Sequence, residues 1–165
     1  MKIYLDMDGV IADFFAGLQS YYNVKHWKDL PDTRASVDNL KLTDFFNTLD
    51  VFPTSAKLVS FVRDLAGDNY GICSSPLRGD KMNSGYWKRV WLERQGFMPK
   101  VENLIFTGMK ERYAVGFYDV PNILVDDKPS NIESWNKAGG IGIRYQANED
   151  SLEKLFQKIL ATYTK

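Results

Sequence analysis

Short apolar runs alternate with longer amphipathic segments along most of the chain, and this alternation constrains the fold more than any other feature. The apolar runs have the length of buried strands, whereas the longer segments place apolar residues at helical spacing. Strands that alternate with helices form a parallel sheet with helices on both faces. The sequence therefore predicts an α/β fold with a Rossmann-like parallel sheet. The expected strands occupy residues 1–5, 70–73, 103–106, 122–125 and 141–145.

The expected helices lie between and after these strands. Residues 55–66 present an apolar face, with Ser55 as the expected N-cap and Gly67 at the end. The remaining helices are expected at residues 81–95, from 130 or 131 to 138, and from 152 to about 160.

Residues 14–51 interrupt the alternation, because they separate the first strand from the next helix without containing a clear strand. A segment of this length is too long for a simple connection in a compact domain. Helical fragments are expected around residues 14–22 and 43–49, with a polar, turn-prone stretch between them. We expect residues 14–51 to form a small helical cap, and residues 1–13 and 52–165 to form the core.

Size and charge exclude several classes of protein. With 165 residues, of which 44% are hydrophobic, the chain is long enough for one sizeable core. Lys and Arg together number 21, as do Asp and Glu, so we expect no attraction to duplex nucleic acid or an anionic membrane. The single Cys73 and the absence of an apolar leader favour a cytoplasmic location. A homodimer is compatible with the sequence.

Carboxylates and hydroxyls follow three of the expected strands. Because parallel strands end at the same edge of a sheet, these side chains should meet in one crevice. Clustered carboxylates repel one another, and oxygen ligands of this kind favour a hard divalent cation such as Mg²⁺. A single Asp at a strand end is more often a loop cap, but coincidence at three ends favours a site. The residues are Asp6 and Asp8 after the first strand, Ser74 and Ser75 after the second, and Asp126 and Asp127 after the fourth.

Three motifs resemble those of haloacid dehalogenase-type phosphatases. They are Asp-Met-Asp-Gly-Val at 6–10, Ile-Cys-Ser-Ser-Pro at 72–76 and Leu-Val-Asp-Asp at 124–127. Within that superfamily the chain resembles the 5'(3')-deoxyribonucleotidases. The stretches that carry this closer resemblance are 6–14, 73–78 and the Phe45-Phe46 pair followed by Leu49 and Pro53.

The resemblance implies a chemical role for each acidic residue. Asp6 would be the nucleophile that forms an aspartyl-phosphate, and Asp8 would be the general acid and base. Mg²⁺ would be held by the Asp6 side chain, the Asp8 carbonyl and one of the two later carboxylates. We favour Asp126 over Asp127 as that direct ligand.

Polar and aromatic residues would complete the catalytic and substrate-binding set. Ser74 is expected to donate to a phosphoryl oxygen, and Lys110 to neutralise the charge that builds during transfer. Lys100 and Lys128 are rivals for the latter role.

Substrate binding is expected from Ser75, Arg78, Phe14 and Phe45. Arg78 could form a forked contact with phosphate, although a surface role is nearly as well supported. Phe14 and Phe45 could stack on a base, whereas most aromatic residues of residues 14–51 are expected to pack the cap.

The sequence thus predicts a Mg²⁺-dependent phosphoric monoester hydrolase of the 5'-nucleotidase type. Its expected substrate is a small phosphate ester, a nucleoside monophosphate. Two alternatives stay open: a phosphatase of the same chemistry that acts on another small ester or on a nucleic-acid end, and a non-catalytic protein that binds a phosphorylated ligand.

Overall fold

The computed structural model describes residues 1–163. Within them, five strands form one sheet in the order β3-β2-β1-β4-β5, and all neighbouring strands are parallel. The strands are β1 (Ile3–Leu5), β2 (Tyr70–Ser74), β3 (Leu104–Phe106), β4 (Ile123–Asp126) and β5 (Ile141–Arg144). No strand extends more than one residue beyond its expected range, and the predicted α/β class is confirmed.

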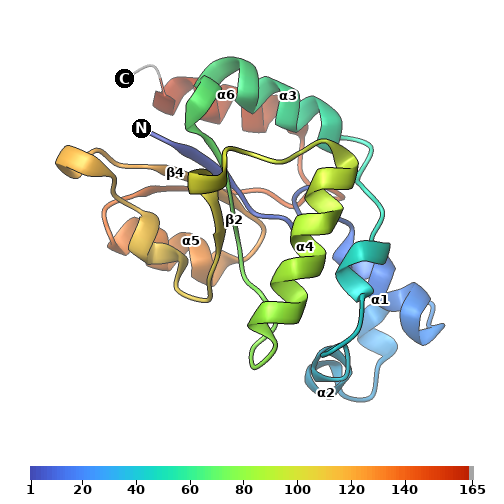
Figure 1. Ribbon diagram of the computed structural model, residues 1–165. Coiled ribbons are helices and arrows are strands. Elements are labelled where there is room, and N and C mark those ends of the chain that lie inside the picture. The colour runs from blue at the N-terminus through green and yellow to red at the C-terminus, as the bar shows by residue number, and fades with distance from the viewer. Residues whose placement is uncertain (164–165) are drawn as a thin grey trace.

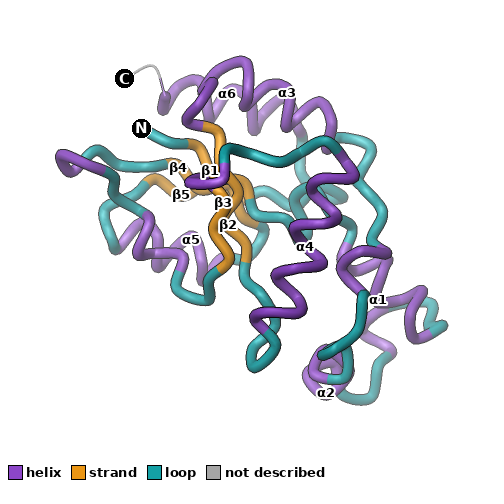
Figure 2. Tube along the Cα trace, viewed as in Figure 1, coloured by secondary structure: helices purple, strands orange, loops and turns teal. Residues whose placement is uncertain are grey.

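Helices cover both faces of the sheet (Figures 1 and 2). Side chains alternate across β1, so Ile3 and Leu5 pack on one face and Tyr4 on the other. The first face is covered by α3 (Ser55–Ala66) and α6 (Leu152–Tyr163), and the second by α5 (Pro129–Lys137). No helix within residues 1–163 is long and apolar enough to cross a bilayer.

The order of the strands positions the ligand-binding edge of the sheet. The chain runs from β1 to β2 and β3 on one side, and then returns to place β4 and β5 on the other side of β1. The strand order therefore reverses between β1 and β4. In open α/β sheets ligands bind at such a switch point, beyond the carboxyl ends of the strands.

The start of α3 differs from the prediction. Thr54, not Ser55, is the N-cap, and Ser55 is the first residue of the helix. The Ser55 hydroxyl is fully buried and donates to the Ile11 carbonyl at 2.7 Å. The side chain thus anchors the helix to the loop after β1 instead of capping a backbone N–H.

Residues 14–51 contain one helix more than the sequence predicts. Besides α1 (Phe14–Tyr22) and the 3₁₀ turn η2 (Phe45–Thr48), a helix α2 (Thr33–Asp38) lies in the stretch expected to be turn-prone. The Asp32 carboxylate caps α2 by accepting from the Ala35 N–H at 2.9 Å. A short 3₁₀ turn, η1 (Trp27–Asp29), precedes it.

Helix α4 (Lys81–Gln95) joins this segment to the sheet (Figure 1). Its Trp91 is fully buried, and the indole N–H donates to the Leu49 carbonyl at 2.7 Å. η2 packs along the same helix. Side chains on α4 can therefore reach from the 14–51 segment to the carboxyl ends of the strands.

Candidate active site

The loop after β1 is shaped by a glycine that allows a close approach. Gly9 has a φ of +78°, which favours glycine, and a Cβ at this position would lie 2.6 Å from the Asp127 Oδ2. Asp6 at the end of β1 donates its N–H to the Val125 carbonyl at 2.9 Å. Its Oδ1 accepts from the Met7 N–H at 2.7 Å. The loop therefore brings Asp6 and Asp127 to the switch point between β1 and β4.

Three carboxylates gather at that point. Asp6, Asp126 and Asp127 each place one oxygen so that the three oxygens lie within 4.8 Å of one another. Burial and the charge of Asp6 raise the pKa of the Asp126 carboxyl. Burial, with the neighbouring carboxylates, also raises the pKa of Asp127 to about 7. Three acidic side chains thus lie close together on this side of the site.

Lys110 joins two members of the cluster. Its Nζ lies 2.6 Å from the Asp126 Oδ2 and 3.0 Å from the Asp6 Oδ2, and the residue is almost fully buried. Burial alone would lower the pKa of this lysine, but the two carboxylates outweigh it and raise the pKa. Of the two rivals, Lys100 pairs with Asp68 at 2.6 Å, and Lys128 has an exposed side chain.

The Asp126 carboxylate is also held from the loop that follows β4. Its Oδ1 accepts from the Lys128 N–H at 2.8 Å, and its Oδ2 accepts from the Asn131 amide at 2.9 Å. Asn131 lies on α5, so this helix helps to fix the carboxylate. These bonds hold the side chain in one orientation, as ligands of a metal ion require.

A second group of side chains centres on Lys88, which is not among the predicted site residues. Lys88 on α4 is fully buried, with its Nζ 2.6 Å from the Asp8 Oδ2 and 2.9 Å from the Ser74 Oγ. The ring of Phe46 lies against the same ammonium, 4.5 Å from it at the centroid. One cation thus links the loop after β1, the end of β2 and the 14–51 segment.

The other oxygen of Asp8 has no partner. Among the buried side-chain polar atoms of residues 1–163, the Asp8 Oδ1 is the one that forms no hydrogen bond. Burial raises the pKa of the Asp8 carboxyl, partly offset by the nearby Lys88. A carboxyl group with a raised pKa and a free oxygen has what a proton donor needs.

The donor set suits a magnesium ion. Two oxygens on opposite sides of a Mg²⁺ ion lie about 4.2 Å apart, since each bond is about 2.1 Å long. The oxygens of Asp6, Asp126 and Asp127 all lie within 4.8 Å of one another, a limit slightly above that separation. A hard cation would also offset the carboxylate repulsion that, together with burial, raises the pKa of Asp127.

The four predicted substrate-binding residues do not gather as the catalytic ones do. Ser75 directly follows Ser74, whereas Arg78 is exposed and lines a cleft against α2. Phe14 is half-buried and packs against Phe45 at 5.6 Å between ring centroids. Phe45 is only 1% exposed, so its ring has no free face for a base in this structure.

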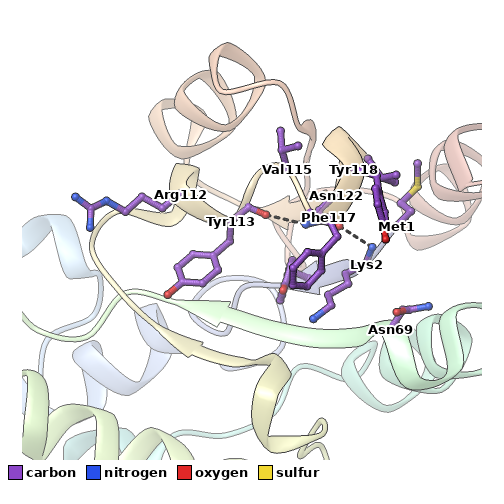
Figure 3. Close-up of a pocket in the computed structure, with 12 residues that line it drawn as sticks. Met1, Lys2, Asn69, Arg112, Tyr113, Val115, Phe117, Tyr118 and Asn122 are labelled. Atoms are coloured by element: carbon purple, nitrogen blue, oxygen red, sulfur yellow. Dashed lines mark hydrogen bonds between the residues drawn. The ribbon is translucent and has the colours of Figure 1, made fainter.

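A separate cavity of about 690 Å³ contains none of the predicted site residues (Figure 3). It lies beside the N-terminus, under the loop that carries the exposed Phe117 and Tyr118. The Asn122 side chain fixes its wall by accepting from the Lys2 N–H and donating to the Tyr113 carbonyl. Among residues 1–163, no acidic residue lines it. The predicted catalytic residues therefore lie at the carboxyl ends of the strands, outside this cavity.

No family model matches this chain. A curated protein does resemble it in sequence. The chain is 24% identical over 151 residues to the mitochondrial 5'(3')-deoxyribonucleotidase of Mus musculus. The match covers 78% of this chain and 65% of the mouse protein, so the chain spans just under two thirds of that relative's length.

Three solved structures share the fold. A hydrolase from Streptococcus pneumoniae is 13% identical, with a TM-score of 0.51 over 96% of this chain and 97% of that one. A haloacid dehalogenase-superfamily hydrolase of subfamily IA from Geobacter sulfurreducens is 11% identical, with a TM-score of 0.51 over 90% and 88%. A haloacid dehalogenase-like hydrolase from Streptococcus pneumoniae is 12% identical, with a TM-score of 0.54 over 99% and 98%.

At these identities the structural matches show the fold, which is that of haloacid dehalogenase-superfamily hydrolases. The sequence match to the mouse enzyme agrees with this fold. The predicted resemblance to the superfamily is therefore confirmed.

Proposed function

We propose that this chain, which has the fold of haloacid dehalogenase-superfamily hydrolases, is a Mg²⁺-dependent phosphomonoesterase that hydrolyses nucleoside monophosphates. The observation that carries the proposal is the position of Asp6, which faces two further carboxylates and Lys110 at the switch point of the sheet. The likeness to a deoxyribonucleotidase supports the nucleotide as substrate.

In the first step, a carboxylate oxygen of Asp6 attacks phosphorus and the bond to the leaving oxygen breaks. Asp8 gives its proton to that oxygen, which departs as an alcohol. The raised pKa of Asp8 keeps the proton available, and the free Oδ1 has no bond to lose when it donates. The product of this step is an aspartyl-phosphate on Asp6.

In the second step, the Asp8 carboxylate takes a proton from water, and the resulting oxygen attacks phosphorus. The bond to Asp6 breaks, inorganic phosphate leaves, and both carboxyl groups return to their starting states. Lys88 stabilises the ionised form of Asp8 between the two steps, because its ammonium lies 2.6 Å from that carboxylate.

Cations and donors of the site would share the phosphoryl charge. The Ser74 hydroxyl and the Lys88 ammonium, which lie 2.9 Å apart, would both bind the phosphoryl oxygens. Mg²⁺, held by Asp6, the Asp8 carbonyl and Asp126, would neutralise the phosphate and polarise it for attack. Lys110, which bridges Asp6 and Asp126, would neutralise the charge that builds during transfer.

Residues 14–51 act as a cap in this proposal, over a core of residues 1–13 and 52–165. The half-buried Phe14 would contact the base of the substrate, and the buried Phe45 packs against the Phe14 ring. A cytoplasmic location and a homodimer stay predictions.

A panel of substrates tests the proposal. We expect the wild type to hydrolyse an aryl phosphate and nucleoside monophosphates with Mg²⁺ and not in excess EDTA. Asp6→Asn should retain the fold and lose turnover, whereas Asp64→Asn, an exposed carboxylate on α3, should retain activity. Turnover in EDTA would contradict the metal, and turnover by Asp6→Asn would contradict the nucleophile.

A further inference from the structure

A basic cleft lies between α2 and the loop that leads from β2 to α4. Its volume is about 960 Å³. The charged residues that line it are Arg34, Asp38 and Lys41 from the 14–51 segment and Arg78 from the loop. In Figure 1 this loop extends from the end of β2 toward the side of the molecule that carries α2.

Positive charge is in excess in this cleft. Lys41 pairs with Asp38 at 2.9 Å, and this contact lowers the pKa of Asp38, with further contributions from Arg34 and Arg78. Three cations therefore surround one carboxylate, which leaves a local charge of +2. Within residues 1–163, neither the Arg34 nor the Arg78 guanidinium forms a salt bridge. Unpaired guanidinium groups favour phosphate oxygens, which they can bind in a fork.

The two walls of the cleft are fixed to each other. The buried Asp80 accepts from the Leu42 N–H at 3.2 Å and from the Asn83 amide at 3.0 Å. The same Asn83 amide donates to the Thr43 carbonyl at 2.9 Å. Leu42 has a φ of +62°, which is unfavourable for a leucine. The segment after α2 is thus held against α4 in a conformation that has an energetic cost.

The cleft is within reach of the candidate catalytic residues. Ser74, which bonds Lys88, is four residues before Arg78, and four extended residues span at most about 14 Å. The Ser-Pro-Leu stretch at 75–77 connects them. A phosphate at Ser74 and a second phosphate at Arg78 can therefore belong to one substrate.

We propose that the cleft of Arg34, Lys41 and Arg78 binds a second phosphate, so that a nucleoside bisphosphate or a strand with a terminal phosphate is a better substrate than a nucleoside monophosphate. The inference rests on the proposed function, because the first phosphate reacts at Asp6. Hydrolysis then releases one inorganic phosphate and leaves the second phosphate on the product.

Three substrates test this with the Mg²⁺-loaded enzyme: a deoxynucleoside 5'-monophosphate, the matching 3',5'-bisphosphate and a 5'-phosphorylated oligonucleotide. We expect kcat/KM for at least one of the last two to exceed that of the monophosphate about tenfold at low salt, and the advantage to shrink as salt rises. A preference for the bisphosphate or for the oligonucleotide identifies the source of the second phosphate. Equal values for all three would overturn the inference.

A charge-neutralising variant gives the matched comparison. Arg34→Gln with Lys41→Gln should abolish the preference while the monophosphate rate stays within about twofold. Lys158→Gln, an exposed lysine on α6, should preserve it. A preference that survives the double substitution would overturn the assignment to this cleft.

Binding separates this inference from the proposed function. Calorimetry on Asp6→Asn should give about tenfold tighter binding of the bisphosphate than of the monophosphate, and the double substitution in that background should remove the difference. This readout needs no turnover, so a chain that fails to hydrolyse any ester still tests the cleft. Equal binding of the two ligands would contradict the second-phosphate site.

Discussion

The Lys88 ammonium forms a 2.6 Å ion pair with the Asp8 carboxylate, although the two residues are 80 positions apart in the chain. Lys88 is fully buried, and a lysine is rarely buried without a partner. The pair couples α4 to the loop after β1, so packing of the helix determines where Asp8 stands. Lys88 is therefore a part of the candidate site as well as a part of the core.

Replacement of Lys88 should impair catalysis strongly. Lys88→Met keeps the apolar stem but removes the charge between Asp8 and Ser74, and we expect kcat on a nucleoside monophosphate to fall about 10²–10³-fold. Steady-state kinetics measure the loss. Lys81→Met, at the exposed start of the same helix, serves as control and should retain full activity. A variant at Lys88 that keeps more than half of the wild-type kcat would contradict this role.

The role of Lys88 does not follow from the sequence, because the apolar spacing of residues 81–95 predicts a helix but not which polar side chain on it enters the site. A signal was present: Lys88 stands three residues before Trp91 and four before Leu92, which places it on the buried face of the helix. What faces that position depends on how α4 packs against the strand ends, and no local pattern encodes this packing. Lys110, in contrast, comes shortly after the end of β3, and parallel strands bring such ends to one edge of the sheet.

The sheet and the carboxylate cluster were predictable because each depends on short-range patterns. Apolar runs end at Asp6, Ser74 and Asp126, and parallel strands bring such ends together. α2 was missed because its six residues are mostly polar and its stability comes from the Asp32 cap and from tertiary contacts. The burial of Phe45 depends on the whole 14–51 segment, so periodicity could not distinguish a packed ring from a ligand contact.

Gly9 should be required for the position of Asp127. In Gly9→Ala the new methyl group would meet the Asp127 carboxylate at 2.6 Å, and the left-handed backbone adds about 1–2 kcal/mol of strain. We expect lower stability in urea denaturation and a loss of Mg²⁺-dependent activity. Gly108→Ala, where nothing lies within 4 Å of the new Cβ, should change neither. Equal effects of the two substitutions would show that Gly9 does not act through Asp127.

Buried thiol and phenol groups should make the protein sensitive to alkali. Burial raises the pKa of Cys73 from its ordinary value of 9.0 to about 12, and that of Tyr4 from 10.0 to about 12. Above pH 9 the unfolded chain loses protons that the folded chain retains, so the free energy of unfolding should decrease as pH rises from 9 to 12. Urea melts across this range measure the slope, and Cys73→Ala should make it shallower between pH 9 and 10. A flat profile would contradict the raised pKa values.

Phe45 should contribute more to stability than to substrate selection. Its ring packs against Phe14, Tyr21 and Phe46, so Phe45→Ala removes a buried aromatic group and should cost about 3–5 kcal/mol of unfolding free energy. KM should rise by a similar factor for a nucleotide and for an aryl phosphate. A rise confined to the nucleotide would restore the predicted stacking role. Phe45→Leu, which retains an apolar group of similar size, should recover most of the stability.

The importance of Asp8 should depend on the leaving group. A sugar alkoxide needs a proton to depart, whereas nitrophenolate departs without one. Asp8→Asn cannot supply that proton, so we expect it to slow the first step strongly with a nucleoside monophosphate and much less with p-nitrophenyl phosphate. The substitution preserves an oxygen near the Lys88 ammonium, so the packing of α4 should be retained.

With the aryl phosphate, Asp8→Asn should form the aspartyl-phosphate on Asp6 and then hydrolyse it slowly, because no base activates the incoming water. Rapid-quench measurements should therefore show a burst of nitrophenol followed by slow turnover, and the wild type should show a smaller burst. Lys88→Met separates proton transfer by Asp8 from positioning of Lys88, because this variant lacks the ammonium but keeps the Asp8 carboxyl group. If Asp8→Asn slows both substrates equally and without a burst, as loss of the cation would, then Asp8 acts by positioning Lys88 and not by transferring protons.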